Sequence, residues 1–148
     1  MKRSKRINNI KKIRVLSEKE AMSKLAQALS AQQQVQLRYQ DLIQFRKEYQ
    51  HNMQQSGRQG IAASRILGFH QFLENLDRAI DQQAKQLAEQ ERLVQDLRLA
   101  WQQHRKALTG VENWMEQVLE QERKMDESKE QKELDELANR IKHQRKPY

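Results

Sequence analysis

The chain has 148 residues, of which 36% are hydrophobic and 32% charged, with one Pro and four Gly. This composition does not suit a compact core; high charge with a helical period favours long helices or a coiled coil, whereas disorder would require unpatterned apolar residues. The chain has no Cys, which excludes disulfides, thiolate metal sites and thiol nucleophiles.

Charge is concentrated at the two ends. The first 14 residues carry seven positive charges and no acid, and Arg140, Lys142, Arg145 and Lys146 add four more at the other end. The stretch INNIKKIRVL has no continuous apolar run, and no segment approaches the roughly 20 apolar residues of a transmembrane helix. We therefore expect a soluble cytoplasmic protein.

The first expected elements are a basic arm over residues 1–16 and a helix over about 17–55. Ser17 and Glu20 have the spacing of a capping box at the start of this helix. A second, offset apolar stripe of Met22, Leu29 and Ile43 leaves the register of the helix open. The main stripe consists of Ala21, Leu25, Ala28, Val35, Tyr39, Leu42, Tyr49 and Met53.

A turn is expected over about 56–63, because QQSGRQGIAAS contains Gly57 and Gly60, the only close glycine pair. Glycine permits the backbone conformations that a reversal needs. The sequence therefore predicts an antiparallel helical hairpin, formed as a single coiled-coil domain over 1–148.

The second expected helix spans about 64–142 and has a clear period. Alternating steps of three and four from Leu73 to Met125 give 16 positions, of which 12 are apolar. This 3.5-residue period predicts a supercoiled seam that continues through Gly110, with one unbroken helix. Four seam positions are polar, and we interpret them as residues that fix the register of the coiled coil or weaken it locally: Gln83, Gln90, His104 and Glu122.

The second helix is longer than the first and should extend beyond it. At about 1.5 Å per residue the two helices would span roughly 70 Å and 115 Å. The seam pattern ends after Met125, and the helix is expected to continue without the same partner. The basic arm should then lie beside the long helix, at the end where both termini gather.

No pattern indicates chemistry. The four His have no metal-ligand spacing, and neither a phosphate-binding loop nor a nucleophile motif occurs. We therefore predict a protein that is not an enzyme and that binds no metal or cofactor.

Two surfaces remain as candidate binding sites. Each expected helix carries one stripe next to the seam, and the two stripes should be neighbours across the hairpin. Together they could widen the seam, form a dimer interface or bind a partner. The basic end is either solvated or binds an acidic partner, and the absence of aromatic residues before Tyr39 favours protein over nucleic acid. The two stripes are Arg38, Leu42, Phe45 and Tyr49, and Phe72, Leu76, Ala79 and Gln83.

Two stretches resemble the FliJ family of the bacterial flagellar type III export apparatus: RKEYQHNMQQSGRQGIAASRILGFHQFLENLDRAIDQQ (46–83) and ERKMDESKEQKELDELANR (122–140). The resemblance implies an antiparallel two-helix coiled coil similar to the central stalk of rotary ATPases. Members dock in the pore of the hexameric export ATPase, promote its assembly and activity, contact the cytoplasmic domain of the export gate protein and bind export chaperones.

The resemblance also implies sites, a location and an oligomeric state. The gate-binding surface maps onto the two stripes, where Arg38, Phe45 and Gln83 depart from the commoner residues. The protein would be a cytoplasmic monomer when free, associated peripherally with the inner-membrane apparatus through proteins. A nucleic-acid-binding or self-assembling coiled coil remains the alternative. The residues expected to face the ATPase ring are Lys11, Lys12, Arg14, Arg140 and Lys142.

Overall fold

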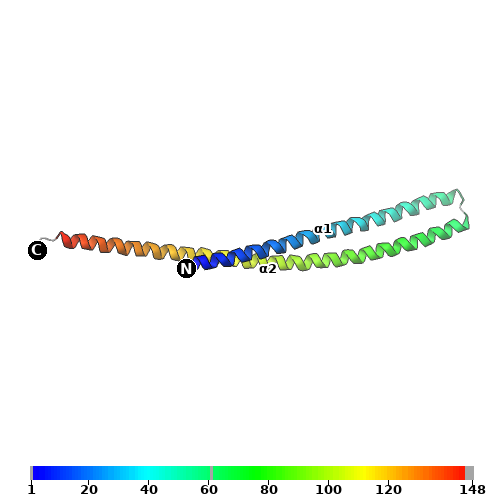
Figure 1. The fold of residues 1–148 in the computed structure, drawn as a ribbon. Helices are drawn as coiled ribbons and strands as arrows, with labels where there is room; N and C mark the ends of the chain where they lie inside the picture. Colours follow the sequence, from blue (N-terminus) through cyan, green and yellow to red (C-terminus); the bar gives the residue numbers. More distant parts are fainter. Residues whose placement is uncertain (1, 61, 146–148) are drawn as a thin grey trace. The chain divides into compact units, whose positions relative to one another are not determined.

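A computed structural model of the chain describes residues 2–60 and 62–145. It contains two helices, α1 (Arg3–Arg58) and the longer α2 (Ala63–Gln144), and no strand among these residues. The helices pack against each other (Figure 1), which confirms the predicted all-helical, two-helix coiled coil. The described residues divide into two compact units, one formed by 2–19 with 103–145 and the other by 20–102. A single domain over 1–148 stays a prediction.

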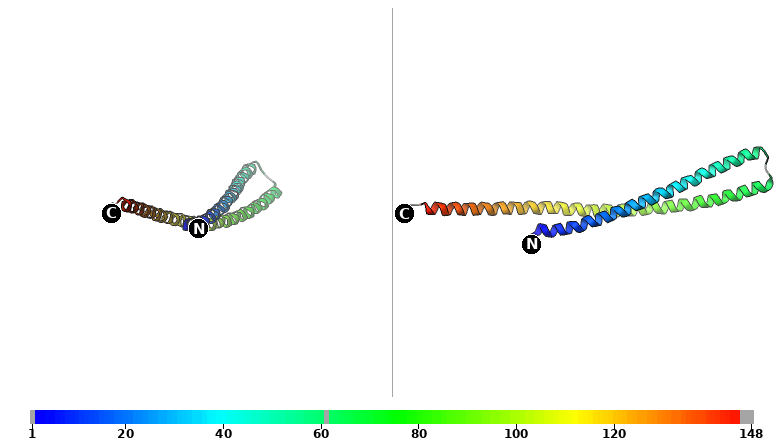
Figure 2. Two further views of the ribbon diagram at one scale, coloured as in Figure 1. Left: turned by 60° about the vertical axis from the view of Figure 1, so that its left-hand side comes forward. Right: turned by 45° about the horizontal axis from the view of Figure 1, so that its top comes forward.

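The unit formed by residues 20–102 is a helical hairpin, in which the two helices are antiparallel and diverge toward the turn (Figures 1 and 2). Leu25, Ala28 and Val94 are buried together, and Leu97 and Trp101 pack against them. Two alanines in the core, Ala21 and Ala28, have no side chain beyond Cβ, which permits close approach of the helix backbones.

The reversal between the helices depends on glycine. The N–H of Gln59 donates to the carbonyl of Ser56 (3.1 Å), and Gly60 adopts φ of 86°, in the left-handed region. Side chains with a Cβ rarely adopt this conformation, so a glycine is required there. The turn falls within the predicted 56–63 segment, of which Ile61 lies outside the described residues.

The predicted 3.5-residue period of α2 is confirmed by burial. Of the 16 positions from Leu73 to Met125, only Met125 is exposed, and Leu76, Val94, Leu108 and Val118 are buried. The helix continues through Gly110 without a break, as predicted. The polar exceptions are all half-buried, so the seam includes them.

The open register of α1 is decided by the partner helix. Ala21, Leu25 and Ala28 are buried, whereas Met22 is 48% exposed and Leu29 40% exposed. Ile43, the third residue of the offset stripe, is half-buried. The main stripe therefore faces α2 over residues 21–28, because the two stripes start one residue, about 100°, apart and only one of them can point directly at the partner helix.

In the other unit, α1 begins at Arg3, so the predicted basic arm over 1–16 and the helix start near Ser17 are wrong. Ser4 and Ile7 are buried, and the backbone N–H of Ser4 donates to Oε1 of Glu122 at 3.1 Å. The free N–H groups of a helix start need an acceptor, and here a carboxylate 118 positions away supplies one. Burial of Ile7 adds apolar stabilisation to these first turns.

Residues 123–144 of α2 are all exposed. Lys2 pairs with Asp126 (3.5 Å), and α2 then continues to Gln144 with its apolar residues, Leu134, Leu137 and Ile141, in solvent. This agrees with the expected extension of α2 beyond the seam. Exposed pairs within the helix, such as Arg123 with Glu120 and Glu127, support it locally.

Candidate partner-binding surfaces

Four aromatic side chains gather near the turn of the hairpin, and we call them the aromatic patch: Phe45, Tyr49, Phe69 and Phe72. The Tyr49 ring centroid lies 4.5 Å from Phe72 and 5.3 Å from Phe69. Phe45 meets Phe72 edge to face at 6.2 Å. These contacts join α1 to α2, so the two stripes are neighbours, as the sequence predicts.

The aromatic patch is partly open to solvent. Phe45 is 46% exposed and Phe72 38%, while Tyr49 and Phe69 are half-buried. Two phenylalanines that remain this exposed after packing against each other form a site where a partner can bury more apolar area.

The eight residues expected to bind the gate all lie in the hairpin unit, but they differ in accessibility. Arg38, Phe45 and Phe72 are exposed; Leu42, Tyr49, Ala79 and Gln83 are half-buried. Leu76 is only 7% exposed and belongs to the core. The face available to a partner is therefore narrower than the two stripes, because part of each stripe also forms the seam.

The sequence places Phe69 beside Phe72 on the face next to the seam, but Phe69 was not among the residues expected to bind the gate. It also continues the seam upstream, since a step of four back from Leu73 reaches it. A second member of this region was missed. Arg46 forms an ion pair with Asp77 across the hairpin, with Nε 2.6 Å from Oδ1. The hydrogen bond and charge of Asp77 raise the pKa of Arg46. No local spacing reveals this pair, because the two residues belong to different helices.

A cavity at the turn adjoins the aromatic patch. It is lined by apolar and polar side chains from both helices, and Phe69 belongs to both features. The lining residues are Met53, Gln54, Gly57, Gly60, Ile66, Phe69 and His70.

The basic residues expected to face the ATPase ring fall into two groups. Lys12 and Arg14 are exposed and Lys11 is half-buried on α1, whereas Arg140 and Lys142 are exposed near the end of α2. The start of α1 pairs with α2 at Glu122 and Asp126. The structure therefore does not bring the groups together; Arg140 lies well beyond the paired segment. Lys146 lies outside the described residues.

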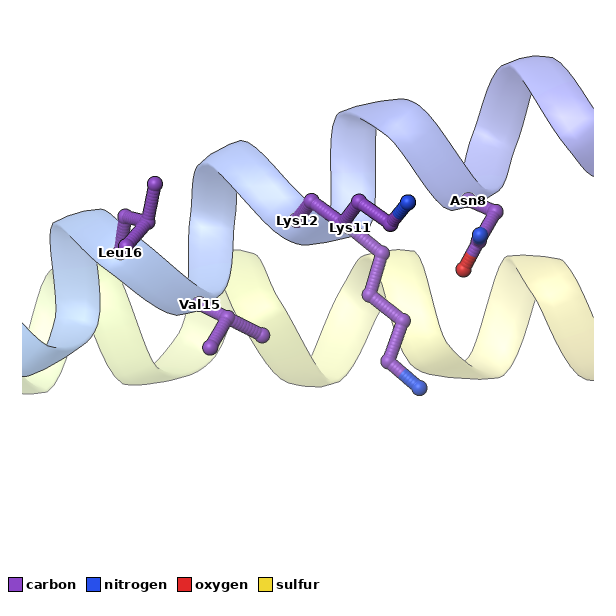
Figure 3. A pocket seen from close by; sticks show the side chains of 5 residues that line it. All are labelled: Asn8, Lys11, Lys12, Val15 and Leu16. Atoms are coloured by element: carbon purple, nitrogen blue, oxygen red, sulfur yellow. The ribbon is translucent and has the colours of Figure 1, made fainter.

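A shallow apolar groove accompanies the first group (Figure 3). It is lined by Asn8, Lys11, Lys12, Val15 and Leu16. In Figure 3 the Lys11 side chain extends across α2, and Leu16 points away from it.

Within residues 2–60 and 62–145, no group of three or more His, Asp or Glu side chains is arranged to hold a metal ion. Neither described helix has a stretch apolar and long enough to cross a membrane.

The fold and these surfaces define an antiparallel coiled-coil protein whose candidate functional groups are exposed aromatic and basic side chains. The family model described as "Flagellar FliJ protein" matches residues 3–147, so the chain belongs to the FliJ family. The chain is therefore a component of the flagellar protein export apparatus. The FliJ family is not a known enzyme family.

Two relatives have the same description, flagellar FliJ protein. The one from Salmonella typhi is 29% identical over 103 residues, and the one from Escherichia coli (strain K12) is 27% identical over 99 residues. Each match covers 67% of this chain and 67% of the relative. No solved structure matches the chain significantly.

Proposed function

We propose that this protein is a non-enzymatic adaptor that couples the hexameric export ATPase to the export gate. The observation that carries the proposal is the family match over residues 3–147, together with an exposed aromatic patch and exposed basic segments in one chain. The protein would act in the cytoplasm, associated peripherally with the inner-membrane apparatus through other proteins.

The gate would bind the aromatic patch. Phe45 and Phe72 are the anchors, because they are large, aromatic and more than a third exposed, and Arg38 lies exposed on the same helix as Phe45. Aromatic side chains at the centre of an interface commonly account for most of its binding energy. Ala79 and Gln83 would contribute their accessible edges, and Leu76 would support the surface from within.

The ATPase ring would bind the basic segments. Lys12, Arg14, Arg140 and Lys142 are exposed, and a ring pore lined by acids would attract them. One asymmetric chain inside a six-fold ring would contact its subunits unequally, and this would promote assembly and activity of the hexamer. Export chaperones would bind the free protein.

Gate binding is tested with single substitutions that spare the core. We expect Phe72→Ala and Phe45→Ala each to weaken binding of the gate protein's cytoplasmic domain about tenfold or more, measured by calorimetry, since exposed aromatic anchors typically contribute this much. Leu99→Ala is the matched control, because Leu99 is 50% exposed on α2 away from the aromatic patch. Equal affinities of all three variants and the unmodified protein would contradict the gate assignment.

ATPase coupling is tested separately. Addition of the full chain should raise the ATP turnover of its cognate ATPase and its hexamer fraction in analytical ultracentrifugation. Arg140→Gln with Lys142→Gln should reduce both effects without changing helicity, because both side chains are exposed. An ATPase that neither assembles nor accelerates with the full chain would refute this part of the proposal.

A further inference from the structure

Three large apolar side chains of α1 are exposed close to its start. Ile10 is 39% exposed, and Ile13 and Leu16 are each 64% exposed. Their neighbours Ser4 and Ile7 are buried against the other helix of the same unit. The exposed residues therefore cannot be covered by α2, because they lie on the other side of α1.

The helical register places these side chains together. In the seam period of α1, Ser4, Ile7 and Lys11 face α2, so residues 10, 13 and 16 fall on adjoining outward positions. Figure 3 shows the result for one of them, since Leu16 points away from α2 whereas Val15 lies over it. The three side chains form an apolar strip that winds about 120° around the outward half of α1.

Basic residues lie along this strip. Arg6 lies one turn before Ile10 and two turns before Ile13, and Lys5 and Lys12 follow the edge beside Leu16; all three basic side chains are exposed. The first 14 residues contain no acid that could neutralise them locally.

α2 adds an aromatic residue beside the Ile10 edge of this strip. Trp114 is 39% exposed, and the Arg3 guanidinium lies 5.7 Å from its ring centroid. Arg3, Ile10 and Trp114 each lie immediately before a seam residue of their helix. In an antiparallel pair of helices, the positions equivalent to these lie on the same flank of the pair. We call this surface the outer N-terminal face: Arg3, Arg6, Ile10, Ile13, Leu16 and Trp114.

Acids on α2 lie away from this flank. The residues of α2 that adjoin Trp114 on its flank by register are Gly110, Gln117 and Gln121, none of which is charged. The nearby carboxylates of Glu112, Glu116 and Glu120 fall on the opposite flank or the back of α2. The outer N-terminal face is thus positively charged with an apolar centre.

We propose that the outer N-terminal face binds directly to the surface of a bilayer that contains anionic lipids. Aliphatic side chains, an interfacial Trp and bordering Lys and Arg are the combination by which a helix lies in the headgroup region of such a bilayer. Phosphates of nucleic acid would satisfy the cations but leave Ile13 and Leu16 in water. The lipid contact is independent of the proposed gate contact and adds a second attachment to the membrane. It would alternate with the proposed ATPase contact, because Lys12, at the edge of this surface, belongs to both contacts.

Vesicle sedimentation with the full chain tests this proposal. The protein should bind vesicles of phosphatidylglycerol and phosphatidylethanolamine at low salt, and should remain in the supernatant with phosphatidylcholine alone. Ile13→Ser with Leu16→Ser should weaken binding about tenfold, because two inserting side chains are lost. Both positions are mostly exposed, so circular dichroism should show unchanged helicity.

A matched control separates insertion from general loss of apolar surface. Leu134→Ser with Leu137→Ser replaces two leucines of α2 that are 60% and 54% exposed but lie outside the outer N-terminal face. This variant should bind the anionic vesicles as well as the unmodified protein. The proposal would be overturned if the Ile13/Leu16 variant bound the anionic vesicles as well as the unmodified protein does. It would also be overturned if the unmodified protein did not bind these vesicles, whether or not it binds duplex DNA.

Tryptophan fluorescence supplies an independent readout. The chain has two Trp, and Trp101→Phe leaves Trp114 as the only Trp, whose emission is separated from that of the three Tyr by excitation at long wavelength. Its emission should shift to shorter wavelength on addition of the anionic vesicles and should be quenched by brominated lipid. Vesicle binding without a change in Trp114 emission would show that another surface makes the contact and would refute the assignment.

Discussion

Replacement of Gln83 by Leu should stabilise the hairpin. Gln83 occupies a seam position of α2, and its Oε1 is buried without a hydrogen-bond donor among the described residues. A buried acceptor without a partner costs about 1–3 kcal/mol. A half-buried leucine at the same place contributes about 1 kcal/mol through apolar burial. With partial loss of fit to the existing packing, we expect a net gain of about 2 kcal/mol.

Urea unfolding followed by circular dichroism measures this gain. With a slope of about 1–3 kcal/mol per M, the midpoint should rise by about 1 M. Gln82→Leu is the matched control, because it makes the same change at the exposed neighbouring position and should leave the midpoint nearly unchanged. If both variants moved the midpoint equally, the gain would reflect helix propensity, and the buried-acceptor reasoning would be refuted.

Further perturbations follow from the same structure. Gly110→Ala should stabilise α2 by about 1 kcal/mol in urea unfolding, since the added Cβ meets nothing within 4 Å, whereas Gly60→Ala should destabilise because φ is +86°. Leu76→Ala should lower the unfolding free energy by about 2–4 kcal/mol, and an unchanged value would contradict its burial. The hydrogen bond from Arg123 lowers the pKa of Glu120 from its ordinary 4.5, so Arg123→Gln should raise that pKa in NMR titration. The pKa of Glu120 is lower in the folded than in the unfolded chain, so its pairing with Arg123 stabilises the fold above pH 4.5. This stabilisation is lost as the pH falls through the folded pKa.

The burial of Leu76 changes how the gate surface should be tested. A double substitution of Phe72 and Leu76 would remove an exposed anchor and a core residue together. Loss of binding could then arise from a weakened hairpin, and the assay would not report on the surface. Phe72 and Phe45 can be changed alone, because each remains more than a third exposed.

The sequence was sufficient for the features that repeat locally. The period from Leu73 to Val118 identified the seam of α2, since a 3.5-residue spacing keeps one face of a helix toward its partner. The same continuity predicted that α2 passes through Gly110. Gly60 marked the turn, because its backbone conformation is one that other residues rarely adopt.

The family resemblance, too, is visible in two stretches of the sequence, 46–83 and 122–140. It implies the two-helix fold that the chain adopts, and the family match over residues 3–147 confirms the membership. The sites that the resemblance implies remain proposals that the binding experiments above can decide.

Only the tertiary structure decided features that depend on a distant partner. The stripe of Leu25 faces α2 because it packs with Val94, and no property of α1 alone excluded the offset stripe of Met22. α1 begins at Arg3 because Glu122 accepts the N–H of Ser4, a cap that a search of neighbouring residues cannot find. Local spacing determines which faces a helix has, but contact with the other helix determines which face is buried and where the helix can start.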